Sequence, residues 1–238
     1  MKKALLIIIP LFFVLAACKD KKAKSKQTTD TIQVIKEDTL KVIKQTTNKD
    51  SVILSITKKD SVLLLNTTKQ ILILLKNKNY SILADFIHPS SGVRFSPYAY
   101  VDTIGNADTG RKPDVRFSKE QFINQFKNKR KNKIDWGYYD GSGELMRLNI
   151  DKYFERFVYN SDFLNAEKTS VNKAIGRGND ANNLTEVYKG CNFTESYCPI
   201  CHGGSGEEWF NWCSLRLVYK KHEGKFYLVG IIHAEWTT

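Results

Sequence analysis

The spacing of hydrophobic residues along this chain changes from a helical period to a strand period. Residues 62–75 are apolar nearly all round, which predicts a buried helix with Asp60 or Ser61 as its N-cap. Further on, apolar residues return at helical spacing behind capping residues, which predicts shorter amphipathic helices. These helices are expected at residues 80–87, closed by His88 and Pro89, at 118–126 behind Ser118, and at 149–158 behind Asn149.

The last part of the chain alternates apolar and polar residues as β-strands do. Residues 214–220 and 226–236 alternate around a turn at 222–225, which predicts a long C-terminal β-hairpin. Helices first and a hairpin last predict an α+β fold, with N-terminal helices packed on a curved antiparallel sheet. This order of elements resembles the NTF2-like or cystatin-like cone, and the resemblance implies a pocket between the helices and the sheet.

The N-terminus has the pattern of an export signal. A basic start is followed by an uncharged run over residues 4–17, which is shorter than the about 20 residues of a membrane span. Residues 15–18, LAAC, resemble the lipobox of bacterial lipoproteins. The resemblance implies that residues 1–18 are a signal peptide ending at Cys18, which is acylated with chains such as palmitate. Lys19 then favours the outer membrane of the cell envelope. The alternative is a plain secreted protein.

Residues 19–60 predict a flexible polar tether ahead of one globular domain at 61–238. The tether contains no Gly, Pro, Trp, Phe or Tyr and is rich in Lys, Thr and Asp, so it can bury little apolar surface. Four copies of Asp, then Ser or Thr, then an aliphatic residue resemble the O-glycosylation sequon of one group of lipoprotein-rich diderm bacteria. Short alternating strands are the other interpretation. The glycosylation candidates are Thr31, Thr39, Ser51 and Ser61.

The net charge of +12 is spread along the chain, with one dense cluster at residues 127–133, KNKRKNK. An exported, lipid-anchored protein seldom meets nucleic acid, so no nucleic-acid partner is predicted. Anionic lipid heads and acidic polysaccharide are the physically reasonable partners of such charge. A solvated basic loop that binds nothing is the simpler interpretation of the cluster.

Four cysteines remain for the exported domain, where disulfides persist. We predict two bridges. Three pairings are possible and the sequence does not choose between them, but Cys191–Cys198 with Cys201–Cys213 is favoured because a Cys198–Cys201 bridge would close a very small ring. Residues 179–211 are polar, rich in Gly and Asn, and long for a connection, so they are expected to be a loop that the bridges staple.

The same cysteines allow three other interpretations. All four thiolates, of Cys191, Cys198, Cys201 and Cys213, could hold zinc. Residues 198–202, CPICH, match a c-type haem attachment motif. However, the two further cysteines and the glycine-rich segment that follows the motif do not suit a haem pocket. A thioredoxin-like redox pair would need a helix at this point. In the haem interpretation His202 is the proximal ligand, and the distal candidates are Met146, His88, His222 and His233.

Strand alternation places His233 and Glu235 on one face, about 7 Å apart. Asp140 and Glu144 flank a glycine turn, and His88 ends a helix. A histidine and carboxylates that converge suffice for general acid–base chemistry or for a metal, so a hydrolase-like envelope enzyme is one hypothesis. The sequence contains no nucleophile elbow, phosphate loop or His-Glu-x-x-His motif, which favours a protein that is not an enzyme.

Aromatic residues offer a binding hypothesis of another class. Exposed aromatic rings mark interfaces, whereas buried rings fill cores. A set of such residues could line a face that binds a small molecule, a glycan or a protein. The candidates are Trp136, Tyr138, Tyr139, Trp209, Phe210, Trp212 and Trp236.

Three short sequence motifs resemble a signature of uncharacterised exported bacterial proteins. They lie at residues 88–98, 136–144 and 228–237, and the resemblance covers most of residues 80–238. It implies no activity and no cofactor. The sequence therefore predicts a membrane-anchored lipoprotein of the bacterial envelope whose single domain binds a ligand or partner.

Overall fold

The structure, a computed structural model, describes residues 56–176, 182–201 and 208–237. The predicted signal peptide, most of the tether, and the predicted sites Cys18, Thr31, Thr39, Ser51 and His202 lie outside the described residues. Within the described ranges, no helix is both long and apolar enough to cross a membrane.

The first helix, α1 (Lys58–Lys76), begins earlier than predicted and buries only one face. Thr57 caps it, since its hydroxyl accepts a hydrogen bond from the backbone N–H of Asp60 at 3.1 Å. The predicted caps Asp60 and Ser61 are therefore wrong, because both lie inside a polar first turn that hid the start of the helix. Val62 remains 53% exposed. The buried side chains are Leu64, Thr67, Thr68, Ile71, Leu72 and Leu75.

The shorter predicted helices are confirmed, and those behind Ser118 and Asn149 begin at the predicted caps, whereas α2 begins without a side-chain capping hydrogen bond. Ser118 and Gln121 form a capping box at the start of α3 (Lys119–Lys127). The side chain of Asn149 accepts a first-turn N–H of α4 (Ile150–Tyr153) at 2.9 Å. The other helical segments are α2 (Tyr80–Leu83), the 3-10 turns η1 (Ala84–Phe86) and η3 (Phe163–Asn165), the π-helical η2 (Phe154–Val158), α5 (Leu184–Val187) and α6 (Glu208–Asn211).

Six strands form the main sheet in the order β2-β1-β8-β7-β6-β5, and β3 and β4 form a separate hairpin. The predicted C-terminal hairpin is confirmed as β7–β8, and its turn residues Glu223 and Gly224 both have positive φ, as a type I′ turn requires. The strands are β1 (Val93–Ser96), β2 (Arg116–Phe117), β3 (Lys133–Tyr138), β4 (Leu145–Asn149), β5 (Lys168–Val171), β6 (Asn192–Cys198), β7 (Cys213–His222) and β8 (Lys225–Glu235).

Two sequence predictions about this sheet are wrong. The sheet is not wholly antiparallel, because β1 pairs with β8 in parallel, with Arg94 opposite Gly230. This pairing covers an edge that β8 would otherwise leave open. Residues 179–211 are not simply a stapled loop, since β6 runs through them between β5 and β7. Both faces of β6 are buried, so its polar residues gave no alternating signal.

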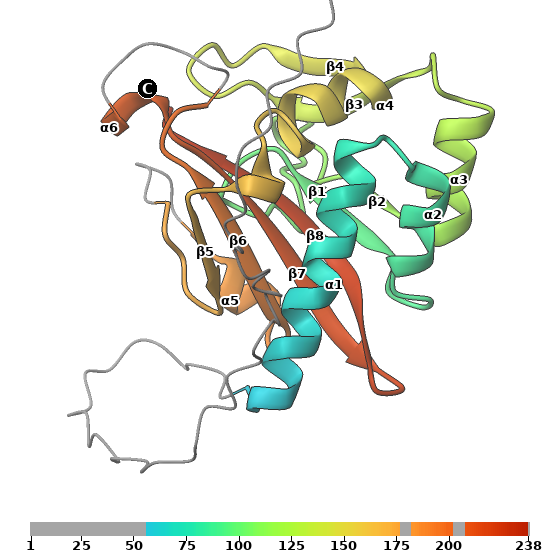
Figure 1. Ribbon diagram of the computed structural model, residues 1–238. Coiled ribbons are helices and arrows are strands. Elements are labelled where there is room, and N and C mark those ends of the chain that lie inside the picture. The colour runs from blue at the N-terminus through green and yellow to red at the C-terminus, as the bar shows by residue number, and fades with distance from the viewer. Residues whose placement is uncertain (1–55, 177–181, 202–207, 238) are drawn as a thin grey trace, which may run out of the picture. The chain divides into compact units, whose positions relative to one another are not determined.

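Opposite faces of the sheet are covered by different parts of the chain. Figure 1 shows α1 lying across the sheet in front of β7 and β8. On that helical face, aromatic rings fill the interior, with Trp136 stacked on Tyr153 at 3.6 Å and in edge contact with Phe95 at 6.0 Å. The other face carries a smaller core of Val101, Leu184, Phe193, Val218, Val229 and Ile232.

Candidate functional site

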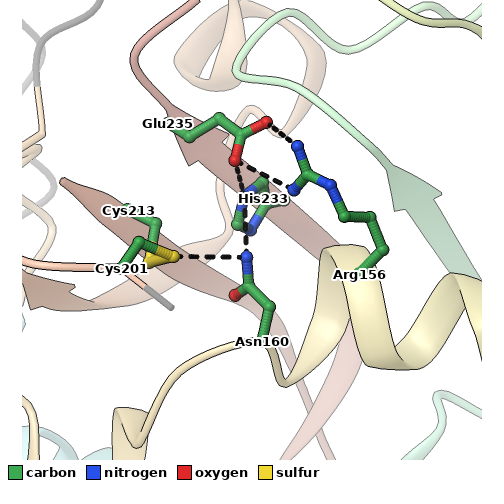
Figure 2. The surroundings of a disulfide bond; sticks show 6 residues. All are labelled: Arg156, Asn160, Cys201, Cys213, His233 and Glu235. Carbon is green, nitrogen blue, oxygen red and sulfur yellow. Dashed lines mark hydrogen bonds and ion pairs between the residues drawn. A yellow bond between two sulfur atoms is a disulfide. The ribbon is translucent and has the colours of Figure 1, made fainter. Parts of the chain in front are cut away.

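The predicted pair His233 and Glu235 is in direct contact on the helical face of β8. The Nε2 of His233 lies 3.1 Å from the carboxylate of Glu235, closer than the predicted 7 Å because the two side chains lean together. Arg156 of η2 donates hydrogen bonds to the same carboxylate from both terminal nitrogens, at 2.9 and 2.5 Å. Figure 2 shows this group beside the Cys201–Cys213 disulfide.

The electrostatics of this group make it a clamp between β8 and η2. Burial raises the pKa of Glu235, but the bonds from His233 and Arg156 outweigh it and hold that pKa at about 2. His233 is 0% exposed, so no bound molecule reaches its ring in this arrangement. Asn160 lies 3.5 Å from His233 Nε2 and donates to Cys201 Sγ at 3.4 Å, which links the clamp to the disulfide.

The other predicted catalytic residues do not join this pair. Asp140 lies in the β3–β4 loop, where its N–H donates to the hydroxyl of Tyr98 at 3.0 Å. The backbone N–H of His88 donates a hydrogen bond to the backbone carbonyl of Leu228. Because Leu228 precedes His233 by five residues, the two histidines are about 17 Å apart along β8. No hydrogen bond or ion pair between described side chains joins Asp140 or His88 to His233 and Glu235.

The cysteines follow one of the two predicted pairings. Cys201 and Cys213 form a disulfide with their Cα atoms 5.5 Å apart. The predicted Cys191–Cys198 bridge is wrong, since the two residues bracket the seven-residue strand β6 and stand about 23 Å apart. The same separation rules out a four-cysteine zinc site. Because Cys201 is in a disulfide, CPICH here lacks the two free thiols that a covalent haem or a thioredoxin-like pair would use.

A pocket that the sequence did not predict lies where β1 ends and the β3–β4 hairpin turns. Its volume is about 470 Å³, and we call it the tyrosine pocket. Tyr100 and Tyr138 are 48% and 36% exposed, while Trp136 forms part of the pocket from within the core. Its side-chain groups are Tyr98, Tyr100, Trp136, Tyr138, Tyr139, Arg111, Lys112, Asp114 and Asp140.

The predicted aromatic candidates fall into separate places. Trp136, Tyr138 and Tyr139 belong to the tyrosine pocket. Trp212 is buried and stacks on Tyr197 at 5.9 Å. The remaining pair, Phe210 and Trp236, are in edge contact at 4.9 Å, and the side chain of Trp209 lies outside the described residues. The sequence analysis therefore singled out four of the nine side chains named for the tyrosine pocket, the first three rings named above and Asp140, but did not predict that they meet in one hollow.

Asp114 is the titratable group that the tyrosine pocket perturbs most. Burial raises its pKa to about 6, although two hydrogen bonds oppose the shift. Ser96 Oγ donates to its carboxylate at 2.5 Å, and the N–H of Asp102 donates to the same oxygen at 3.0 Å. Arg94 fixes this loop by donating to the carbonyls of Asp102 and Asp114. No local sequence signal marks Asp114, because its partners lie 18 and 12 residues away.

Replacing Asp114 by asparagine should stabilise the protein at neutral pH. Because the folded pKa of about 6 lies above the ordinary 3.8, the ionised carboxylate opposes folding. Stability should therefore fall as the pH rises from about 4 through 6. Asparagine keeps an acceptor oxygen without the charge, so the free energy of unfolding near pH 7 should rise by up to about 2 kcal/mol.

Urea unfolding near pH 4 and near pH 7 measures this effect, with the exposed Asp108→Asn variant as control. A wild-type stability that does not fall between these two pH values would contradict the assignment. So would an Asp114→Asn variant that is less stable than wild type near pH 7.

Comparison with known proteins assigns this chain to no family. No family model matches the sequence, and no curated protein matches it. Among solved structures, the chain is similar to one described as a putative calcium/calmodulin dependent protein kinase II association domain from Xanthomonas campestris. The identity is 15%, the match covers 81% of this chain and 97% of that chain, and the TM-score is 0.30. A likeness at that TM-score decides neither fold nor function.

Proposed function

We propose that this protein is an envelope lipoprotein whose domain binds a glycan in the tyrosine pocket. The single observation that carries the binding role is the pocket of about 470 Å³ with exposed tyrosines beside carboxylates and cations. The anchor at Cys18 and the outer-membrane location rest on the N-terminal sequence pattern, and incorporation of labelled palmitate tests them. The finer fold assignment, an NTF2-like or cystatin-like cone, rests on the order of helices before sheet.

The chemistry of the pocket suits a carbohydrate better than a purely apolar compound. Sugar rings present apolar C–H faces that pack on aromatic rings, and their hydroxyls bond to carboxylates and cations. Tyr100 and Tyr138 offer exposed ring surface, whereas Asp140, Arg111 and Lys112 supply polar groups around it. Exposed rings gathered at one hollow are typical of a binding site, because contiguous exposed apolar surface marks interaction sites, whereas scattered single side chains do not.

Tyr138→Ala should weaken glycan binding by about tenfold, which corresponds to about 1.4 kcal/mol. The ring provides contact surface without supporting the core, so folding should be little changed. Screening the full-length protein on an array of neutral and acidic oligosaccharides, followed by calorimetry on the retained sugars, measures the effect.

Phe210→Ala is the matched control, because Phe210 is also an exposed ring, 55% against 36% for Tyr138, and lies outside the pocket. Retention of no oligosaccharide by the wild type would refute the glycan proposal. An equal loss in both variants would remove the tyrosine pocket as its location.

A further inference from the structure

A second hollow lies on the face of the sheet opposite α1 and gathers positive charge. Its volume is about 320 Å³, and we call it the basic pocket. Arg94, Arg116, Lys189 and Lys220 all line it. Across the described parts of the chain, none of these four cations forms an ion pair with a carboxylate. Arg116 instead donates through two nitrogens to the carbonyl of Ser91, so the charge of its guanidinium is not neutralised.

An apolar pocket of about 440 Å³ adjoins the basic pocket. The two hollows share Tyr188, Lys189 and Cys191 in their linings, while Leu184 and Phe193 give the second one apolar walls. An exposed carboxylate, that of Glu186, also lies on the apolar pocket, three residues before the shared Lys189 in the sequence. The combined site is thus cationic at one end and apolar at the other.

The register of the sheet creates this polarity. Residues directly opposite one another on neighbouring strands share a face. One such row runs Arg116, Arg94, Gly230, Val218, Phe193 across β2, β1, β8, β7 and β6. Gly230 in its centre makes room for Tyr188, whose hydroxyl would lie only 2.6 Å from a Cβ at that position. The charged and apolar ends therefore belong to one continuous strip.

Two buried hydrogen-bond donors at this end of the sheet have no acceptor among the residues that the structure describes. The Tyr188 hydroxyl is buried without a hydrogen-bond partner among the described residues, and so is His88 Nε2. Nδ1 of His88 accepts the N–H of Ser91 at 3.0 Å, so the proton sits on Nε2. Burial lowers the pKa of His88, and the nearby positive charge of Lys220 and Arg116 lowers it further. The region therefore combines positive potential with unused donors.

We propose that the two adjoining pockets bind an amphiphilic anion, with a phosphate or carboxylate head in the basic pocket and an alkyl chain in the apolar pocket. Arginine and lysine side chains hold such heads by charge-assisted hydrogen bonds. A head group without a chain would leave the apolar pocket unused, and an uncharged chain would leave the four cations unused. This site has no lining residue in common with the tyrosine pocket and stands independently of the glycan proposal.

Cys191 provides a direct readout, because its thiol lies where the two pockets meet. Burial raises the pKa of this thiol and Lys220 opposes the shift, so alkylation should be slow but measurable at mildly alkaline pH. Decyl phosphate added to the full-length protein should reduce iodoacetamide labelling of Cys191 at least fivefold, as quantified by peptide mass. Cys198, at the far end of β6, is the internal reference and should keep its labelling rate.

Affinity should depend on both ends of the probe and on the unpaired lysines. Calorimetry should give roughly three- to fourfold tighter binding for each methylene added between butyl and decyl phosphate. The Lys189→Gln/Lys220→Gln double variant should bind decyl phosphate at least tenfold more weakly. The matched control Lys131→Gln/Lys225→Gln removes the same charge from exposed positions outside both pockets and should bind normally.

Three results would overturn the proposal. Inorganic phosphate that protects Cys191 as well as decyl phosphate does would mean a plain anion site. Decanol that binds as tightly as decyl phosphate would mean that the cations take no part. An equal loss of affinity in the two double variants would assign the effect to net charge rather than to this site. Comparing decanoate with decyl phosphate then identifies which head the site prefers.

Discussion

Glu195→Leu should lower the free energy of unfolding by about 3–5 kcal/mol, which is the usual result of leaving a buried charge unpaired. Glu195 and Arg216 are 0% and 1% exposed, and their Oε1 and Nε lie 3.3 Å apart. Without the carboxylate, the described partner left to the guanidinium is the carbonyl of Gly176, at 2.9 Å. Urea unfolding of the variant and the wild type measures the loss.

Arg216→Met should be the milder change, because Glu195 would keep three donors. The N–H groups of Ile175 and Gly176 donate to it at 2.7 and 3.0 Å, and Ser214 Oγ donates at 2.6 Å. The double variant Glu195→Leu/Arg216→Met should recover part of the loss of the first single variant. A larger loss in Arg216→Met than in Glu195→Leu would contradict this account of the pair.

Cys213→Ser should lower the free energy of unfolding by about 2–4 kcal/mol, because it removes the bridge and leaves Cys201 only Cys198, with which it would close a very small ring. Cys201→Ser should lower the free energy of unfolding by a smaller amount. Cys198 lies directly opposite Cys213 on β6, at the about 4.5–5.5 Å Cα separation that antiparallel pairs and disulfides share. The freed Cys213 can therefore pair with Cys198, and oxidised Cys201→Ser protein should contain that new bridge.

Peptide mapping without reduction identifies the bridge, and urea unfolding gives the stability of each variant. Cys198→Ser serves as the control, since its thiol is not in the native disulfide and its loss should change stability by less than about 1 kcal/mol. Free thiols at both remaining cysteines of oxidised Cys201→Ser would rule out the exchange. Equal destabilisation by Cys201→Ser and Cys213→Ser would do the same.

The capped helices and the C-terminal hairpin could be predicted because their signals are local. Ser118 and Gln121 cap α3 from within one turn, and Glu223-Gly224 is a two-residue connection whose backbone preference is its own. Each of these features depends on residues that are neighbours in the sequence. Their prediction needed no knowledge of what packs against them.

The strands β1 and β6 could not be predicted in the same way, because distant partners define them. From the sequence alone, a glutamate such as Glu195 is expected to face solvent. It is buried here because Arg216 of β7 lies directly opposite and pairs with it. Arg94 shows no sign of pairing with Gly230 at the other end of the domain. Burial of polar groups is favourable only when a partner is supplied, and the partner here lies on another strand.

The candidate sites also divide into features that local sequence signals predict and features that depend on distant partners. Strand alternation alone placed His233 and Glu235 on one face, and the compartment implied by the N-terminus alone favoured disulfides. Only the tertiary structure decided that Arg156 closes the first pair into a clamp. It also turned Asp114 into a group with a raised pKa, and joined Arg116, Arg94, Val218 and Phe193 in one strip. The sequence fixes which side chains an element presents, whereas their charge, exposure and neighbours depend on elements that the chain brings in from far away.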